Sequence, residues 1–322
     1  MGKARRGDQW GEPFAYRSNG YNLLDMIQGH PDLLFMSYTN GTLLNDRVAE
    51  RLADLGNYSP AISVEGWRER TDIRRGEGVF DQVLDAFSRL REVGVPFGIS
   101  LTATRENAKE ILSEKFIDFL FEEQGAAYGW IFHYMPIGRS YTIDLMPTPE
   151  QRLWMWRRSW EIIREKQIFL ADFWNHGTLS HGCISAGRYT GGGYMYIDWN
   201  GFVTPCVFVP YSPVNINDLY AEDKTLTDAW RESFFAEIRD WQEEYVNGDG
   251  EHGNWLVPCP IRDHNAQFRS WLRKHEPDPV DENAAQALLD PDYACGMDAY
   301  DEAYQALSSG VWKRYYLEKQ DN

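Results

Sequence analysis

The chain has 322 residues, enough for one large or two medium domains with a sizeable core. Its 49 acidic and 32 basic residues give a formal net charge of −17, which argues against nucleic acid as a partner because phosphate binding needs a basic surface. No apolar run approaches the roughly 18 residues of a membrane span, and the first residues are not typical of a secretory signal. Four cysteines do not make a disulfide scaffold. We therefore expect a cytoplasmic protein whose thiolates can hold metal.

Residues 11 to about 138 alternate short apolar runs, typical of strands, with amphipathic stretches typical of helices. We expect strands at 33–38, 61–64, 97–101 and 130–134, and helices at 46–55 (with Asn45 as N-cap), 79–93 and 111–123. This rhythm predicts an α/β fold with a parallel sheet, either a barrel or a doubly wound sheet. In both, function gathers at the carboxyl ends of the strands, where Asn40, Glu65, Thr102 and Met135 fall.

The second half of the chain begins with a long helix expected at 150–166 and a further candidate strand at 168–173. Residues 194–206 alternate like strands around Asn200-Gly201, the strongest short hairpin signal. A helix is expected at 226–245, and the chain from His264 onward is predicted to be helical, with interruptions at prolines.

Three cysteines carry the strongest chemical signal. Cys183 precedes the hairpin, Cys206 follows its glycine at Gly201, and Cys259 lies further along the chain. The hairpin can bring two thiolates together and Cys259 can supply a third. Thiolates are soft ligands that suit iron–sulfur clusters or zinc. The alternative is that all three are buried and pack as small hydrophobes, and the spacing alone leaves both interpretations open.

Taken in order, these motifs resemble the back portion of a radical S-adenosylmethionine (SAM) enzyme with a C-terminal auxiliary-cluster domain of the SPASM/twitch kind. The resemblance covers residues 11 to about 265. Gly11-Glu12-Pro13 resembles the end of the Gly-Gly-Glu-Pro motif, which holds the SAM amine, and residues 39–41 resemble the turn after the third barrel strand. Residues 63–66 and 74–76 resemble the ribose-contacting strand and its loop, and residues 135–138 resemble the turn near the adenine. The spacing of Cys183, Gly201, Cys206 and Cys259 resembles the cysteine pattern of the twitch domain.

The resemblance implies a partial (β/α) barrel of the TIM type over residues 11–146, a linking helix over 147–180, an auxiliary-cluster domain over 181–265 and a helical tail over 266–322. It implies that SAM is bound by Glu12, Asn40, Ser63, Glu65, Arg75, Ser100, Thr102 and Met135. It implies an auxiliary [4Fe–4S] cluster ligated by Cys183, Cys206 and Cys259. The fourth iron would have no protein ligand or would be ligated by Asp263 or His264. The implied partners are a small-molecule or peptide substrate and an electron donor, without nucleic acid or membrane.

Several of these residues also have a simpler interpretation. Asn40 can serve only its own turn, because Asn tolerates a left-handed backbone. Ser100 and Thr102 can be plain strand residues, and Glu65 with Arg75 can be an ordinary surface ion pair. The tail residue Cys295 lies outside the pattern and is expected to be a structural thiol.

The sequence departs from the family pattern in its first part. The Cys-x3-Cys-x2-Cys loop that holds the catalytic cluster is absent, and Trp10 stands where the first glycine of the motif is expected. Residues 1–10 are interpreted as a leader not native to the fold, so that the chain is expected to start inside the barrel. Without three more thiolates this polypeptide is not expected to catalyse radical chemistry alone. A partner chain that completes the barrel would remove this obstacle.

Three functions remain open at this point. The first is a radical SAM oxidoreductase, or a fragment of one, that abstracts hydrogen from its substrate. The second is a degenerate, non-catalytic radical SAM protein that acts as a binding or assembly module. The third is a zinc-stabilised barrel hydrolase that uses Glu12 and Glu65 as acid and base.

Overall fold

The computed structural model describes residues 11–247 and 253–318. The expected leader at 1–10, with Trp10, lies outside them. Contacts divide the chain into two compact units: the first runs to His133 and includes Met155–Phe173, and the second comprises Tyr134–Trp154 and the chain from Trp174 onward. The domain boundaries expected from the sequence remain predictions.

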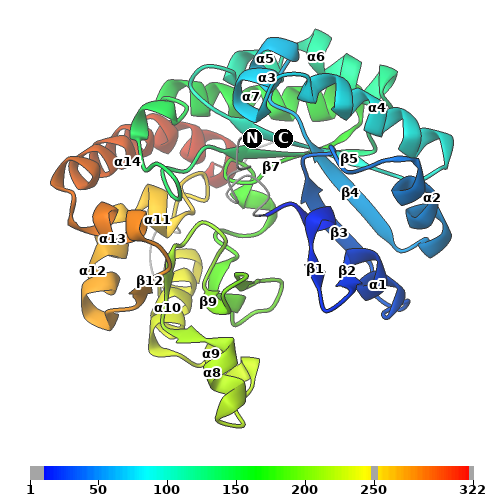
Figure 1. Cartoon of the computed structure of the whole chain (residues 1–322). Coiled ribbons are helices and arrows are strands. Elements are labelled where there is room, and N and C mark those ends of the chain that lie inside the picture. Colours follow the sequence, from blue (N-terminus) through cyan, green and yellow to red (C-terminus); the bar gives the residue numbers. More distant parts are fainter. Residues whose placement is uncertain (1–10, 248–252, 319–322) are drawn as a thin grey trace. The chain divides into compact units, whose positions relative to one another are not determined.

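Five parallel strands form the main sheet of the first unit, in the order β3-β4-β5-β6-β7 (Figure 1). They span Phe35–Thr39, Tyr58–Ser63, Gly98–Ala103, Tyr128–His133 and Phe169–Asp172. Strands that are neighbours in the sheet are also consecutive along the chain, without the reversal of order that marks a doubly wound sheet. Of the two architectures that the sequence left open, the structure therefore shows the barrel type.

The sheet curls strongly. The registers of its strands place Tyr38 on β3 and Phe132 on β6 on the same face, three strands apart. On a flat sheet with strands about 4.8 Å apart, they would be separated by roughly 14 Å, yet their ring centroids lie 5.2 Å from each other. This face is therefore concave, as in part of a barrel. The opposite face carries Ile62, Leu101 and Ile131, which are fully buried.

Helices connect the strands along the outside of the curl (Figure 1). They are α2 (Asp46–Leu55), α3 (Arg68–Arg75), α4 (Val79–Glu92), α5 (Ala108–Ile111), α6 (Glu114–Asp118), the π-helical turn η2 (Phe119–Glu123) and α7 (Pro149–Lys166), of which residues from Met155 belong to this unit. The sheet is preceded by η1 (Pro13–Ala15), a small hairpin of β1 (Arg17–Ser18) and β2 (Tyr21–Asn22), and α1 (Leu23–Gln28).

Most elements of this unit confirm the sequence-based predictions. Helix α2 has the predicted bounds, and Asn45 caps it by accepting a hydrogen bond from the Val48 amide at 3.1 Å. The helix predicted at 111–123 is present from Glu114 onward, as α6 followed by η2. It begins later than predicted because Ser113 caps it by accepting a hydrogen bond from the Phe116 amide at 3.4 Å. Helix α3 was missed, since residues 68–75 are almost all polar and show no apolar stripe.

The second unit contains the predicted hairpin, in which β8 (Tyr196–Ile197) pairs with β9 (Phe202–Thr204). Gly201 in its turn adopts φ +89°, in the left-handed region that favours glycine. Strand β11 (Val214–Asn215) extends this sheet, and β10 (Tyr211–Ser212) pairs with β12 (Asp278–Pro279). Short helical turns lie at η3 (Ile143–Leu145), η4 (Gly177–Leu179), η5 (Ser185–Gly187) and η6 (Lys313–Leu317).

The α-helices that lie wholly in this unit are α8 (Ile216–Ala221), α9 (Leu226–Trp230), α10 (Ser233–Asn247), α11 (Pro260–Asp263), α12 (Asn265–His275), α13 (Glu282–Leu289) and α14 (Pro291–Trp312). The one helix predicted at 226–245 is therefore two helices, α9 and α10. Among the described residues, no helix combines the length and the apolar character that crossing a membrane requires.

The aromatic interior of the curl depends on a glycine. A Cβ atom at Gly98 would lie 2.2 Å from the ring of Tyr128, whose hydroxyl bonds Ser59 at 2.9 Å. We expect Gly98→Ala to lower the free energy of unfolding by about 1–3 kcal/mol through overpacking, measured by urea denaturation. Gly310→Ala on α14 is the control, because a Cβ there meets nothing within 4 Å, and it is expected to stabilise by about 0.5–1 kcal/mol. Equal shifts in both variants would contradict the steric argument.

Candidate functional site

The residues of the first unit that are expected to bind SAM lie at one end of the sheet. Ser63 pairs with Ser100 in the register of β4 and β5, and both side chains are buried on the concave side. Thr102 lies two residues further along β5, while Asn40 and Glu65 follow the ends of β3 and β4. The parallel strand order brings these residues to the same edge, which is where barrel proteins place their sites.

Glu12 is held at this edge by the backbone and side chains around it. Its Oε1 accepts hydrogen bonds from the Thr39 hydroxyl at 2.7 Å and the Phe14 amide at 3.2 Å, and its Oε2 accepts from the Asn40 amide at 2.8 Å. A carboxylate offers about four lone-pair positions, so one remains for a further donor. A buried carboxylate with one free acceptor position fits a charged amine.

The side chain of Asn40 serves its own turn. Its Oδ1 accepts bonds from the backbone amide of Thr42 at 2.9 Å and from the hydroxyl of the same residue at 2.7 Å. This is the simpler role considered for Asn40 in the sequence. The turn also presents the Asn40 amide to Glu12, so Asn40 helps to place that carboxylate.

Glu65 is not part of an ordinary surface pair, because its side chain is only 1% exposed. Its Oε1 bonds Arg75 and lies 3.5 Å from Arg74, and its Oε2 accepts from the Thr102 amide at 3.2 Å. Asn107 donates to the Glu65 carbonyl at 2.9 Å. The carboxylate thus fixes the two arginines at the end of α3 beside the strand ends.

Met135, expected near the adenine, belongs to the second unit. Its side chain is buried, and its carbonyl accepts a hydrogen bond from the Ile137 amide at 2.9 Å.

All three candidate metal ligands lie in the second unit. Cys183 follows η4, Cys206 follows β9, and Cys259 occupies the N-cap position of α11. The Ala186 amide donates to the Pro205 carbonyl at 2.8 Å, which ties the segment of Cys183 to that of Cys206. The hairpin therefore does bring the first two cysteine segments together, as its sequence predicted.

Hydrogen-bonding groups surround the three sulfur atoms. The Tyr194 hydroxyl lies 2.8 Å from the Cys206 sulfur, which also accepts from the Phe208 amide at 3.4 Å. The Cys183 sulfur lies 3.2 Å from the Ser185 hydroxyl and interacts with Gln242, and Trp174 hydrogen-bonds the Cys259 sulfur.

Such groups can all donate to a thiolate. Cysteines that pack as small hydrophobes need no such surroundings. The donor set therefore fits metal-bound sulfur, since partners of this kind orient and stabilise metal ligands.

The thiols are electrostatically coupled. Burial raises the pKa of Cys206 well above its ordinary range, and negative charge on Cys183 or Cys259 raises it further. Burial, together with the charge of Asp263 and of Cys183, raises the pKa of Cys259 to about 12. Without a metal ion the sulfurs are therefore protonated, and a bound metal must deprotonate them.

The spacing of the ligands bears on the kind of metal. Zinc gathers thiolates around one ion at about 2.3 Å, whereas a cluster distributes them over several iron atoms. Within 11–247 and 253–318, no three His, Cys, Asp or Glu side chains are grouped around a single-ion position.

The segment of Cys259 is anchored by a buried ion pair. Arg152 and Asp263 are both fully buried, and their side chains form two hydrogen bonds of 2.5 and 2.9 Å. Asp263 also accepts from the Cys259 amide at 3.2 Å, and its own amide donates to the Cys259 carbonyl at 2.7 Å. Burial alone would raise the pKa of Asp263, but the charges of Arg152 and Arg262 outweigh it and lower the pKa below its usual range.

This network changes the expectation for the fourth iron position. The carboxylate of Asp263 is occupied by arginines, and His264 uses its Nε2 in a 2.9 Å hydrogen bond with the Val257 carbonyl. Asp263 therefore acts in the structure as the anchor of the Cys259 turn.

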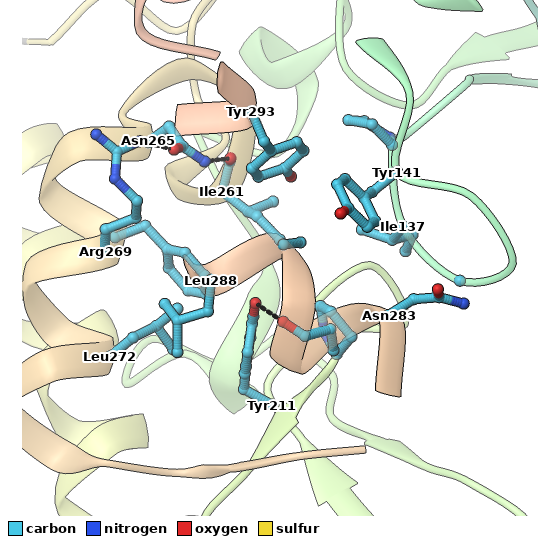
Figure 2. A pocket seen from close by; sticks show the side chains of 16 residues that line it. Ile137, Tyr141, Tyr211, Ile261, Asn265, Arg269, Leu272, Asn283, Leu288 and Tyr293 are labelled. Atoms are coloured by element: carbon cyan, nitrogen blue, oxygen red, sulfur yellow. Dashed lines mark hydrogen bonds between the residues drawn. The ribbon is translucent and has the colours of Figure 1, made fainter. Parts of the chain in front are cut away.

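A cavity lies in the same unit, between residues 136–141, β10 and helices α11–α14 (Figure 2). Its enclosed part has about 20 Å³ of free room, roughly one water molecule, and side chains that line it include those of Ile137, Tyr211, Ile261, Leu288 and Tyr293. A wider, open part of about 420 Å³ adjoins it and shares Tyr141, Asn283 and Tyr293. The enclosed end admits no substrate as it stands.

Sequence reasoning missed the residues that support the cysteines. Arg152, Tyr194 and Gln242 are distant from Cys183, Cys206 and Cys259 in the sequence. A buried arginine on a predicted helix looks like an ordinary surface cation, so no sequence signal marks it. Tyr194, at the start of the predicted hairpin, was visible only as one of several alternating aromatic residues.

Comparison with known proteins defines the class. Residues 9–114 match the family model of the radical SAM superfamily, and residues 183–252 match that of an iron–sulfur cluster-binding domain, SPASM. The chain is thus a radical SAM protein, and its partial barrel agrees with this. More particularly, it belongs to the radical SAM proteins with a C-terminal SPASM domain, whose cofactors are SAM and [4Fe–4S] clusters.

Curated relatives are moderately similar. AdoMet-dependent heme synthase of Methanosarcina barkeri is 26% identical over 64% of this chain and 62% of its own length. The AdoMet-dependent heme synthase of Nitratidesulfovibrio vulgaris is 27% identical over 70% of this chain and 66% of its own. Sporulation killing factor maturation protein SkfB of Bacillus subtilis is 27% identical over 52% and 40%. The chain therefore spans under two thirds of the length of these relatives.

Solved structures share the fold. Streptococcus suis SuiB bound to S-adenosylmethionine superposes with a TM-score of 0.54 at 18% identity, covering 71% of this chain and 55% of that one. SuiB bound to its precursor peptide SuiA gives a TM-score of 0.53 at 18% identity, with coverage of 71% and 54%.

We expect Arg152→Met to lower the free energy of unfolding by about 3–5 kcal/mol, because it leaves Asp263 charged and buried with one cation fewer. The measurement is urea denaturation. The control Lys224→Ala breaks an exposed pair with Glu222 and is expected to cost under about 1 kcal/mol. A single variant as stable as the parent would refute the anchoring role.

Proposed function

We propose that Cys183, Cys206 and Cys259 ligate an auxiliary [4Fe–4S] cluster, and that the protein takes part in SAM-dependent abstraction of hydrogen from its substrate. The observation that carries the proposal is that the three thiols influence one another electrostatically and that each sulfur has hydrogen-bonding groups beside it. Matches to both family models support it.

At the strand ends, this chain's residues would bind and orient SAM. Glu12 offers its free acceptor position to the methionine amine. Ser63, Ser100 and Thr102 line the concave face, where their hydroxyls suit the ribose. Arg75, held by Glu65, places a cation at the same edge. Reductive cleavage of SAM supplies the oxidising power for hydrogen abstraction.

The Cys-x3-Cys-x2-Cys loop of the family does not occur in this sequence, so the thiolates of the SAM-binding cluster must come from another segment or chain. The open edge of the sheet supports this idea. Among the described residues β3 pairs only with β4, and its side chains Met36 and Tyr38 are 46% and 40% exposed. An additional strand that pairs along β3 would cover them and continue the barrel.

Relatives suggest two substrate classes. Two of them are named for heme synthesis and one for maturation of a sporulation killing factor, and SuiB was solved with a precursor peptide. We propose a substrate of one of these kinds, a tetrapyrrole or a peptide.

A non-catalytic binding or assembly module is the second candidate, favoured by the missing cluster loop. The zinc hydrolase finds no support in the geometry. Glu12 and Glu65 are both tied into the chain by hydrogen bonds, which suits neither for acid–base catalysis.

Iron content after anaerobic reconstitution tests the cluster. We expect about four iron atoms per chain, as in one [4Fe–4S] cluster, and a brown protein. Cys183→Ala, Cys206→Ala and Cys259→Ala are each expected to lose most of this iron.

Cys295→Ala is the matched control, because Cys295 is exposed on α14 and lies outside the pattern. A parent chain with less than about one iron, unchanged by Cys183→Ala, would contradict the cluster. A colourless protein that contains zinc would support the hydrolase instead.

Incubation with SAM and dithionite tests catalysis separately. We expect no 5′-deoxyadenosine from this polypeptide alone, even with its auxiliary cluster loaded, because the sequence lacks the three thiolates that activate SAM. Product formation, measured by chromatography, would refute this expectation and also eliminate the non-catalytic module.

A further inference from the structure

Among the groups around the cysteines, Tyr194 stands out by its chemistry. Its hydroxyl lies 2.8 Å from the Cys206 sulfur, and the tyrosine is mostly buried. A metal-bound thiolate has no proton, so in the loaded protein this contact has only one direction, with the phenol as donor. A hydrogen bond to a charged acceptor is roughly twice as strong as a neutral one.

We propose that Tyr194 tunes the auxiliary cluster, by donating a hydrogen bond to the Cys206 sulfur that raises the cluster's reduction potential. The inference rests on the proposed function, since it requires Cys206 to be a cluster ligand. Reduction adds negative charge to the cluster and its sulfurs, and a donor stabilises the reduced form more than the oxidised form. Hydrogen bonds to the sulfurs are among the factors that set the potentials of such clusters.

The fold holds Tyr194 rigidly in place. Its backbone amide donates to the Ile184 carbonyl and its carbonyl accepts from the Gly187 amide, both at 3.0 Å. The phenol is therefore fixed by the same loop that begins at Cys183.

Side chains of helices α9 and α10 donate hydrogen bonds to the backbone of this loop. Arg239 donates to the Ala186 carbonyl at 2.8 Å, Gln242 donates to the Ser185 carbonyl at 3.1 Å, and Trp230 donates to the Gly187 carbonyl at 3.2 Å. A donor positioned in this way acts without reorganisation, and its effect is strengthened by the low dielectric of a buried site.

The Cys206 sulfur has two donors of different kinds. It receives a side-chain hydroxyl and a backbone amide, from Tyr194 and Phe208. The backbone bond cannot be removed by a side-chain substitution, whereas Tyr194→Phe removes one oxygen and keeps the ring. The tyrosine is thus a positioning residue whose contribution can be isolated.

The test is a potentiometric titration of the reconstituted full chain, followed by electron paramagnetic resonance. We expect Tyr194→Phe to keep the iron content of the parent and to have a lower midpoint potential. If the bond is worth tenfold in the equilibrium constant of one-electron reduction, the shift is about 59 mV. Tyr189→Phe is the matched control: it lies on the same loop, bonds Asp240 at 2.9 Å, and is expected to leave the potential unchanged.

A second substitution is expected to shift the midpoint potential in the opposite direction. Difluorotyrosine at position 194 keeps the ring and hydroxyl but makes the hydroxyl a stronger donor, and we expect it to raise the midpoint potential above that of the parent. A purely structural role of Tyr194 does not predict that the two variants shift the midpoint potential in opposite directions. The difluorotyrosine variant also tests the inference if Tyr194→Phe takes up too little iron. An unchanged potential in either fully loaded variant overturns the inference. A parent chain that takes up no iron refutes the proposed function itself.

Discussion

The buried pair of Arg152 and Asp263 is the interaction on which the cysteine site depends. Two charges without exposure to water are costly unless each satisfies the other, and here the pair is bidentate, with further bonds from Arg152 to Asn175 and the Leu256 carbonyl. Asp263 in turn binds the amide of Cys259. Helix α7 thus fixes, through one ion pair, a cysteine more than a hundred residues away in the sequence.

The three thiols have the electrostatic surroundings expected of the proposed cluster site. Burial disfavours the thiolate form and raises the pKa values of Cys183, Cys206 and Cys259. Donors at Tyr194, Ser185 and Trp174 act in the opposite direction, since they bond to the charged form. The balance leaves neutral thiols in the absence of metal and stabilised thiolates in its presence, which is the behaviour expected of a site that assembles around a cluster.

In the strand-end site, the topology of the sheet determines which residues come together. Its polar residues belong to short segments after β3, β4 and β5, and the parallel topology alone places them at one edge. Local hydrogen bonds then decide their roles. Glu12 keeps one acceptor position, Asn40 is used by its own turn, and Glu65 is committed to its arginines. The site therefore combines one open carboxylate with hydroxyls on a concave face.

The sequence by itself determined the local features. Apolar periodicity located β3–β7 and α2, Asn200-Gly201 located the hairpin, and the order of the motifs located both domains of the family. These signals are short-range, so a single chain segment contains them. Only the tertiary structure decided that the sheet curls, that Asp263 pairs with Arg152 beside Cys259, and that the Tyr194 hydroxyl faces the Cys206 sulfur. Each of these depends on atoms from segments that are brought together by packing, and no periodicity or spacing in the sequence encodes such a meeting.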